Sequence, residues 1–407
     1  EGVSQRPGNP ATGPGAGEKA MKCDESLLLD ETRLRKALRR NKFCRGVKRG
    51  GKYVCGGEAS EEEKSKAVEL LIEAINRMRR WKVWNVWWVD EIMDEWLLIR
   101  DRSEIRLRDK YGREVVDSVV RLIDEFINYS ERFRGYWLKV GNEVERLVSE
   151  LLNGKVSVVV RRGALGISIH TESITLKVDR TKTGIPVQLI LDGLDGVYID
   201  VPGIFEMAMS RDEHERFIKE LLIPLKVGFA KTDEGVHHNE PVMDTTQPGQ
   251  AILWSILYSG RIYMRINAVN VNKNDVSITW RLGAVGRHPL KTFDANLSKD
   301  GLISFVFTSI LGDGSARLGT KPVIVITMTK YKRKEWEQLL SKLGIRWSPT
   351  ESGNVTYIYF YSSYAIELAR MMVNTLPSVL RDLLDAMNFK KWETIREIAA
   401  LELNRRG

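Results

Sequence analysis

The chain has 407 residues, enough for two or three domains with apolar cores. Its formal net charge of +9 and isoelectric point near 9.3 favour an acidic partner, most commonly nucleic acid. A membrane span is not expected, because no run of about 18 apolar residues occurs. Residues 1–22 also lack the apolar core of a secretory signal. We therefore expect a cytoplasmic, nucleoid-associated protein.

The first 22 residues are rich in glycine and proline, and we expect a disordered leader there. Three cysteines follow, Cys23, Cys44 and Cys55, at spacings that match no zinc site. Free thiols are the favoured state in an ordinary cytosol. A Cys44–Cys55 disulfide is the alternative in a thermophile, to which the abundance of Lys, Arg and Glu also points.

Residues 23–58 are expected to form a basic arm. The segment 33–52 contains ten cationic side chains and no acidic one. Such an arm is either solvated or binds backbone phosphates, and we favour phosphate binding because unopposed cations release many counterions from nucleic acid. The ten candidate nucleic-acid-binding residues are Arg33, Arg35, Lys36, Arg39, Arg40, Lys42, Arg45, Lys48, Arg49 and Lys52.

Residues 59–153 are expected to form a helical domain. Ser60 followed by three glutamates is a typical helix start, and the next apolar residues follow helical spacing up to Met78. We expect two further helices at about 103–130 and 138–153. A tryptophan cluster lies in this region, and its spacing favours a helical core over base stacking: Trp81, Trp84, Trp87, Trp88 and Trp96.

Residues 154–300 are expected to be rich in β-structure. Short β-branched runs at 156–161, 166–170 and 173–178 are separated by glycine or polar turns. A hairpin is clearer at 262–271 and 276–282, where apolar and polar residues alternate as in a half-buried sheet. Beyond about Ser363 the chain is expected to be helical, with a break at Pro377.

The segment 301–315 is the most informative in the chain. It is an apolar run of helical length that ends in Gly312-Asp313-Gly314. Glycine there indicates close approach of another backbone or a positive φ, and the carboxylate of Asp313 suits a hard divalent cation. The alternative is a buried helix or strand followed by an ordinary turn.

The elements after Asp313 support the first interpretation. A short strand at 316–318, a strand at 322–329, a helix at 330–343, a hairpin at 345–349 and 354–361, and a closing helix give the order αββαββα. The stretch Ile310-Leu-Gly-Asp-Gly-Ser315 together with this order resembles the LAGLIDADG homing-endonuclease family over residues 300–388. The resemblance implies two motif helices on a pseudo-twofold axis, Mg²⁺ held by their terminal acids, and saddle-shaped antiparallel sheets on duplex DNA.

A second copy of the module is therefore expected upstream. Asp195 lies 118 positions before Asp313, and three other segments match at offsets of 118 or 119. These are a strand at 207–210, a helix at 211–225 and a helix at 250–257. Asp195 becomes the second candidate catalytic and metal-binding residue if residues 186–195 form a helix. Pro186 and the short run after it are equally consistent with a strand and turn.

We thus expect an α+β protein whose helical N-terminal region precedes a duplicated LAGLIDADG-like module, with halves at 154–300 and 301–407. Residues 190–390 also resemble the PaRep repeat family (type two b) of Thermoproteales. The first functional hypothesis is a Mg²⁺-dependent DNA endonuclease of mobile-element origin, acting as a monomer. Lys321 and Lys330 are candidates for phosphate contact or charge stabilisation near Asp313. The alternatives are an inactive DNA-binding protein and an RNA-binding or maturase-like factor.

Overall fold

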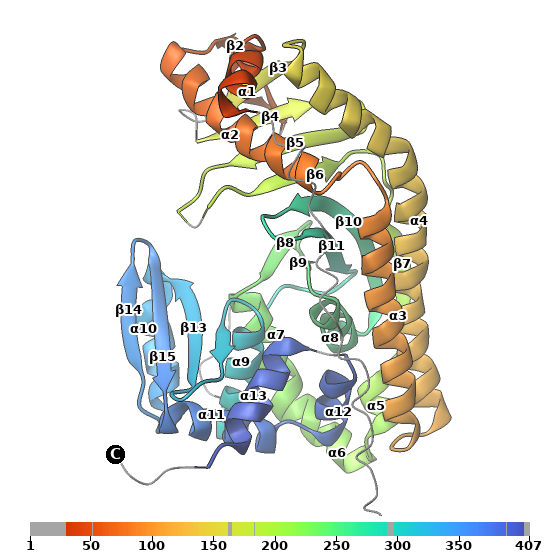
Figure 1. Ribbon diagram of the computed structural model, residues 1–407. Coiled ribbons are helices and arrows are strands. Elements are labelled where there is room, and N and C mark those ends of the chain that lie inside the picture. The colour runs from red at the N-terminus through yellow and green to blue at the C-terminus, as the bar shows by residue number, and fades with distance from the viewer. Residues whose placement is uncertain are drawn as a thin grey trace, which may run out of the picture.

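The computed structural model describes residues 30–50, 52–161, 165–182, 184–290, 297–387 and 389–402. It is a mixed α+β molecule with one large and one small sheet (Figure 1). Two long helices run along one side of the molecule, and most of the shorter helices gather at the end opposite the N-terminal strands. Within these residues, no helix is both long and apolar enough to cross a membrane.

The N-terminal segment is folded, which corrects the expectation of an arm. It forms α1 (Glu31–Leu38) and a hairpin of β1 (Lys42–Arg49) and β2 (Lys52–Glu58). β1 pairs in parallel with a later strand, so the hairpin is the edge of the large sheet. Cys44 and Cys55 form a disulfide across the hairpin, so free thiols were the wrong choice for this pair. Cys23 and residues 1–22 lie outside the described residues.

The helical region consists of three helices, α2 (Glu61–Arg80), α3 (Trp87–Arg108) and α4 (Arg113–Leu152). Ser60 and Glu63 form a capping box that fixes the start of α2. The expected helices at 103–130 and 138–153 are wrong in their bounds, because α4 is a single helix of 40 residues that packs along α3. The tryptophans pack in the core as predicted, with Trp88 and Trp96 fully buried.

The large sheet has 11 strands and extends from the N-terminal hairpin to the centre of the molecule. Its path is β2-β1-β3-β4-β5-β6-β10-β11-β9-β8, with β7 also paired to β10. The remaining strands are β3 (Ser157–Arg161), β4 (Gly166–His170), β5 (Ile174–Asp179), β6 (Val187–Leu191), β7 (Val197–Val201), β8 (Glu234–His237), β9 (Glu240–Thr245), β10 (Gly260–Val271) and β11 (Val276–Ala284). The hairpin predicted at 262–282 is thus confirmed as β10–β11.

Several helices lie between and after these strands. They are α5 (Ile204–Ala208), α6 (Arg211–Arg216), a π-helical segment η2 (Phe217–Leu222), α7 (Ile223–Lys231) and α8 (Pro248–Tyr258). The strand expected at 207–210 is therefore wrong, because these residues belong to α5 and the turn after it.

The C-terminal part follows the predicted order of elements. It contains α9 (Lys299–Leu311), β12 (Ser315–Arg317), β13 (Val323–Thr329), the 3₁₀ turn η3 (Lys330–Lys332), α10 (Arg333–Ser341), β14 (Ser348–Ser352), β15 (Val355–Tyr361), α11 (Ser363–Thr375), α12 (Ser378–Ala386) and α13 (Lys390–Ala400). The small sheet has the order β12-β13-β15-β14. Pro377 separates α11 from α12 as predicted.

Two parts of the molecule have the same topology. The segment from α7 to β11 runs α-β-β-α-β-β, and its strands lie in the order first, second, fourth, third. The segment from α9 to β15 has the same element order and strand order. The element at 186–195 is a strand and turn rather than a motif helix, and α7 lies at 223–231 instead. The matching offset between the two parts is therefore close to 80 residues, not 118 or 119.

Candidate metal and nucleic-acid site

The centre of the candidate site is the close contact of α7 with α9. A Cβ atom on Gly228 of α7 would lie 1.9 Å from the Thr308 hydroxyl and 2.5 Å from the Phe305 carbonyl oxygen of α9. At the start of α9, a Cβ atom on Gly301 would lie 3.1 Å from the Glu220 carbonyl oxygen and 3.2 Å from Pro224 Cγ, a tight but less severe contact. Small residues at such points let two helix backbones approach closely. The two helices therefore pack side by side and run in the same direction.

The helices also end together, and each is followed by an aspartate. A Cβ on Gly312, just after α9, would lie 2.3 Å from the Thr232 hydroxyl and 3.3 Å from the Asp233 carboxyl carbon. Glycine at 312 is thus required for Asp233 and Asp313 to come together. The two carboxyl groups are close enough to share a hydrogen bond.

The pair is electrostatically strained. Removal of solvent by surrounding protein, together with the charge and hydrogen bond of Asp233, raises the pKa of Asp313 to about 6. Lys391 and Lys332 oppose this rise. Asp313 nevertheless keeps an exposed surface, so its carboxyl is crowded rather than enclosed. A cation between the two groups would relieve their repulsion.

Lys391 joins the site from α13, nearly 80 residues after Asp313. Its ammonium donates hydrogen bonds to the carbonyl oxygens of Leu311, at 2.7 Å, and Gly312, at 2.6 Å. A cation at this position complements the C-terminal end of the α9 dipole. Burial lowers the pKa of Lys391, while Asp233 and Asp313 act in the opposite direction.

Gln250 contacts the acid pair through Asp233. Its amide nitrogen donates to Asp233 Oδ2 at 2.6 Å, and Thr245 Oγ1 donates to its amide oxygen at 2.5 Å. Gln250 therefore fixes the orientation of the Asp233 carboxylate. An open polar cavity of about 520 Å³ begins here, lined by Asp233, Gly312, Gln250 and side chains of β6, β9, β10 and β11.

The donor set fits a hard divalent cation. Mg²⁺ prefers oxygen ligands and keeps several waters, so one or two protein carboxylates suffice when a substrate phosphate supplies the rest. Asp233 and Asp313 provide such oxygens beside an open cavity. No cluster of three or more His, Cys, Asp or Glu ligands occurs in the described part of the chain.

The open faces of both sheets extend from the acid pair. Side chains two positions apart along a strand share a face. Ser315, the first residue of β12, lies two positions after Asp313, so it begins the face of the small sheet that continues from Asp313. The pairing of Ser315 with Val325, and of Val325 with Tyr359, carries this face across the small sheet. In the large sheet, the corresponding face carries Arg281 and Asp244, joined at 2.6 Å.

The structure gives Asp313 another neighbour than the predicted Asp195. Asp195 lies in the turn between β6 and β7, where its carbonyl oxygen accepts a hydrogen bond from the Tyr129 hydroxyl at 2.9 Å. The carboxyl group that faces Asp313 belongs to Asp233. The motif helix at 186–195, on which the pairing of Asp195 with Asp313 was based, is therefore absent from the described structure.

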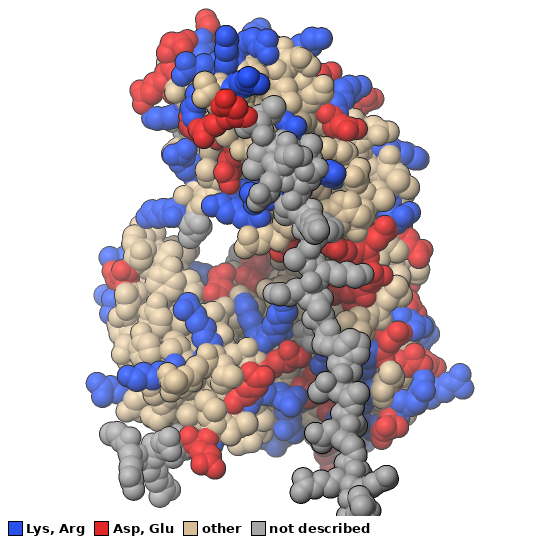
Figure 2. Space-filling model, viewed as in Figure 1, with Lys and Arg blue, Asp and Glu red and all other residues tan. Residues whose placement is uncertain are grey.

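The predicted basic residues of segment 33–52 lie on or beside α1 and the β1–β2 hairpin, at the opposite end of the large sheet from β8, the strand that begins just after Asp233 (Figure 1). Figure 2 shows Lys and Arg side chains interspersed with acidic ones at that end of the molecule. The predicted basic residues are not all unopposed, since Arg35 pairs with Glu31 and Glu69, Arg45 with Glu63 at 3.2 Å, and Lys52 with Asp192 at 3.8 Å. Among the described residues, the exposed members that form no ion pair with another described side chain are Arg33, Lys36, Arg39, Arg40, Lys42, Lys48 and Arg49. Lys321 is exposed in the loop before β13.

Lys330 is engaged elsewhere, because its ammonium lies 2.6 Å from Glu351 on β14. The lysines that act on Asp313 are instead Lys391 and Lys332. Sequence reasoning missed these residues and Asp233. A signal for Asp233 does exist, because an apolar run with a central glycine ends in Thr232-Asp-Glu-Gly235, 80 positions before Leu-Gly-Asp-Gly-Ser315.

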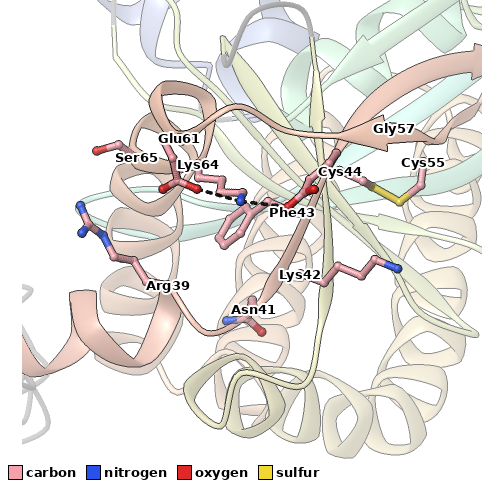
Figure 3. A pocket seen from close by; sticks show the side chains of 11 residues that line it. Arg39, Asn41, Lys42, Phe43, Cys44, Cys55, Gly57, Glu61, Lys64 and Ser65 are labelled. Carbon is pink, nitrogen blue, oxygen red and sulfur yellow. Dashed lines mark hydrogen bonds and ion pairs between the residues drawn. A yellow bond between two sulfur atoms is a disulfide. The ribbon is translucent and has the colours of Figure 1, made fainter.

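We call α1, the β1–β2 hairpin and the start of α2 the N-terminal lobe. A second concavity, of about 470 Å³, lies between these elements (Figure 3). The Cys44–Cys55 disulfide forms part of its wall. Lys64 reaches across it and bonds to Glu61 at 2.8 Å and to Glu58 at 3.2 Å. The charge of Lys64 is thus satisfied by Glu58 and Glu61, whereas Arg39 and Lys42 also line the concavity. Neither Asp233 nor Asp313 is among its lining residues.

Comparisons with known proteins give only distant likenesses. Two solved structures concern DUF199/WhiA. The first is its N-terminal LAGLIDADG domain, 16% identical, with a TM-score of 0.28, covering 39% of this chain and 84% of that domain. The second is the full-length protein from Thermotoga maritima, 12% identical, with a TM-score of 0.26, covering 45% of this chain and 63% of that one. No protein-family model and no curated protein matches the sequence.

Proposed function

We propose that this protein is a metal-dependent endonuclease of duplex DNA, built on a LAGLIDADG-like scaffold. The observation that carries the proposal is the side-by-side packing of α7 and α9, which brings Asp233 and Asp313 together beside an open polar cavity. The shared topology of the two surrounding parts supports an internal duplication in the register of these acids. The proposed pseudo-twofold axis runs between the two helices.

Each nearby residue has a proposed role. Asp233 and Asp313 hold Mg²⁺, and Gln250 orients Asp233 through its 2.6 Å hydrogen bond. Bound Mg²⁺ supplies activation of water and stabilisation of charge on the phosphate oxygens. Lys332 and Lys391 place positive charge beside the reacting phosphate, since both act electrostatically on Asp313.

The large sheet offers groups suited to a duplex. Its open face carries Arg265, Asn267 and Asn270 on β10, and β-strands can enter a DNA groove with such side chains. Gln188 donates to the Asn270 amide oxygen at 3.0 Å, and Asn270 donates to the Thr279 hydroxyl at 2.8 Å. The amides of Gln188 and Asn270 are thus held in place by hydrogen bonds, and they line the same cavity as Asp233. Amides and arginines are the side chains that read base edges.

Binding without cleavage is the second candidate. The observation that favours it is Lys391, whose ammonium is held beside both acids by carbonyl oxygens of the α9 end. That charge neutralises part of the field that would attract Mg²⁺. On this reading, the helix pair is retained for packing and the sheets only hold nucleic acid.

Nicking of supercoiled plasmid DNA in Mg²⁺ separates the two candidates. Asp233→Asn and Asp313→Asn should each lower the rate by roughly a hundredfold or more, because a metal contributes several kcal/mol to the transition state. Asp195→Asn is the matched control and should cut at the wild-type rate. Equal nicking by all four proteins, or none by the wild type, would reject cleavage and leave the binding function.

A further inference from the structure

The last strand of the small sheet carries an exposed row of tyrosines. Tyr357, Tyr359 and Tyr361 occupy alternate positions of β15, so they share one face. Their ring centroids are 6.3 and 5.3 Å apart, and the rings of Tyr359 and Tyr361 are nearly parallel. Tyr361 is 42% exposed, and the other two are half-buried. We call these three residues the tyrosine ladder.

The ladder lies on the uncovered face of the small sheet. The opposite face buries Ile324, Ile326, Ile358 and Phe360 in the core. Strand register gives the side chains that share the face with the tyrosines: Ser315, Arg317, Val323, Val325, Thr327, Thr329, Ser348, Thr350, Ser352 and Val355. No carboxylate occurs among these described positions, whereas Arg317 adds a cation. An aromatic face without acids is compatible with a polyanion.

A basic hairpin reaches one end of the ladder. A Cβ on Gly353, in the β14–β15 turn, would lie only 2.2 Å from the Lys182 ammonium of the β5–β6 hairpin. Arg180 is exposed on the same hairpin. Figure 2 shows an opening through the molecule between this hairpin and the small sheet, with Lys and Arg side chains above it. The small sheet and this hairpin thus border a bounded space.

We propose that the tyrosine ladder binds a single strand of nucleic acid by stacking on its bases, with Lys182 and Arg317 on its phosphates. Alternate residues of a strand are about 6.6 Å apart, which is roughly twice the ~3.4 Å rise of stacked bases. The ring centroids, 6.3 and 5.3 Å apart, are somewhat closer than this, so we place the bases on the exposed ring faces and edges rather than between fixed rings. Ring stacking needs the open faces of bases, which paired and stacked DNA hides.

This inference rests on the proposed nucleic-acid function and adds a substrate feature to it. The large sheet presents arginine and amide side chains, whereas the small sheet presents tyrosines and hydroxyls. The two faces therefore recognise different forms of nucleic acid. The expected substrate has a duplex segment on the large sheet and an unpaired segment on the small one.

Fluorescence anisotropy with labelled single strands tests the ladder. The probes are a 20-nucleotide oligothymidine, the matching oligouridine, and an abasic deoxyribose-phosphate strand of equal length. Tyr357→Ala/Tyr359→Ala should weaken binding of a base-containing strand at least about tenfold, since stacking is worth ~1–3 kcal/mol per base. Tyr357→Phe/Tyr359→Phe keeps the rings and should bind within about twofold of wild type.

Two controls make the result specific. Tyr331, 82% exposed on η3, lies off the ladder, and Tyr331→Ala should leave affinity unchanged. The abasic strand should bind weakly to wild type and show no difference between the Ala and Phe variants. The thermal midpoint of each variant is measured first. If the double Ala variant is unstable, Tyr361→Ala provides the same readout at an exposed position.

Equal affinity of the Ala and Phe variants, or equal binding of abasic and base-containing strands, would overturn the ladder. If the ladder proposal fails in this way, plasmid nicking by the same Ala variant at the wild-type rate would show that the endonuclease proposal still holds. Conversely, loss of cleavage in Asp313→Asn with normal strand binding supports both proposals. Comparison of the thymidine and uridine strands identifies DNA or RNA as the source of the unpaired segment.

Discussion

At the scale of single residues, the site depends on two carboxyl groups that repel each other. Crowding and the neighbouring Asp233 raise the pKa of Asp313 to about 6, against an ordinary value of 3.8, and Lys391 and Lys332 only partly offset the rise. A carboxyl group whose pKa is higher in the folded state than in the unfolded state binds protons preferentially when folded. Stability is therefore lost as pH rises from about 4 to about 6, and the loss is complete above that window.

Asp313→Asn should therefore stabilise the protein at pH 7.5 in EDTA. The gain should be about 1 kcal/mol after allowance for solvent screening of an exposed carboxyl, and it should vanish near pH 4. Chemical denaturation at the two pH values measures it. Asp200→Asn, an exposed strand position, removes the same charge elsewhere and should give no such pH-dependent gain. A gain that is the same at both pH values would contradict the electrostatic explanation.

Individual residues of the site differ in how far the sequence could reveal them. Asp313 could be found because its flanking glycines and apolar run form a local pattern. Lys391 and Gln250 could not, because each reaches the pair from a different element and nothing in its own neighbourhood marks it. Their roles arise from tertiary packing alone.

At the scale of elements, the contact between α7 and α9 decides whether the acids meet. The sequence interpretation ended the upstream helix at Leu225 and missed α7. Pro224 lacks a backbone donor, a π-helical segment precedes it, and Gly228 is a poor helix former. The same Gly228 is what lets α9 approach. Local propensity and tertiary contact thus conflict at this residue, and packing prevails.

Gly228→Ala should destabilise the protein by about 1–3 kcal/mol, because the new methyl group would overlap the Phe305 carbonyl and the Thr308 side chain. Gly135→Ala is the matched control in the middle of α4, where nothing lies within 4 Å of the new Cβ. That control should stabilise by roughly 0.5–1 kcal/mol through helix propensity. Urea denaturation compares the two. Stabilisation by both substitutions would show that α7 and α9 are not in close contact.

Elements with a clear period were predictable. The alternation of β10–β11 and β13–β15 and the apolar length of α9 identify these segments from sequence. The β1–β2 hairpin was not predictable in this way, because its burial is irregular and its cations suggested a solvated segment. Its place is set by parallel pairing with β3, more than 100 residues later.

At the scale of the whole molecule, the N-terminal lobe extends the proposed binding surface. Six interstrand steps separate β10 from β2 in the large sheet. At about 4.8 Å per step, this adds roughly 29 Å, which corresponds to about eight base pairs of duplex. Exposed Lys48 and Arg49 lie at the far edge of this sheet. We expect nucleic acid bound at the acid pair to reach them.

Lys48→Gln/Arg49→Gln should therefore weaken duplex binding and reduce its salt dependence. Removal of two phosphate contacts lowers the slope of log affinity against log salt by about 1.8, and this is measured by anisotropy between about 50 and 200 mM salt. Arg113→Gln/Arg211→Gln removes the same charge near the opposite end of the molecule, where α4 and α6 begin, and should leave the slope unchanged. Because neither pair touches the acids, the cleavage rate of saturated DNA should stay at the wild-type value. Equal slopes for the two double variants would confine the DNA to the central sheets, and the N-terminal lobe would then have another role.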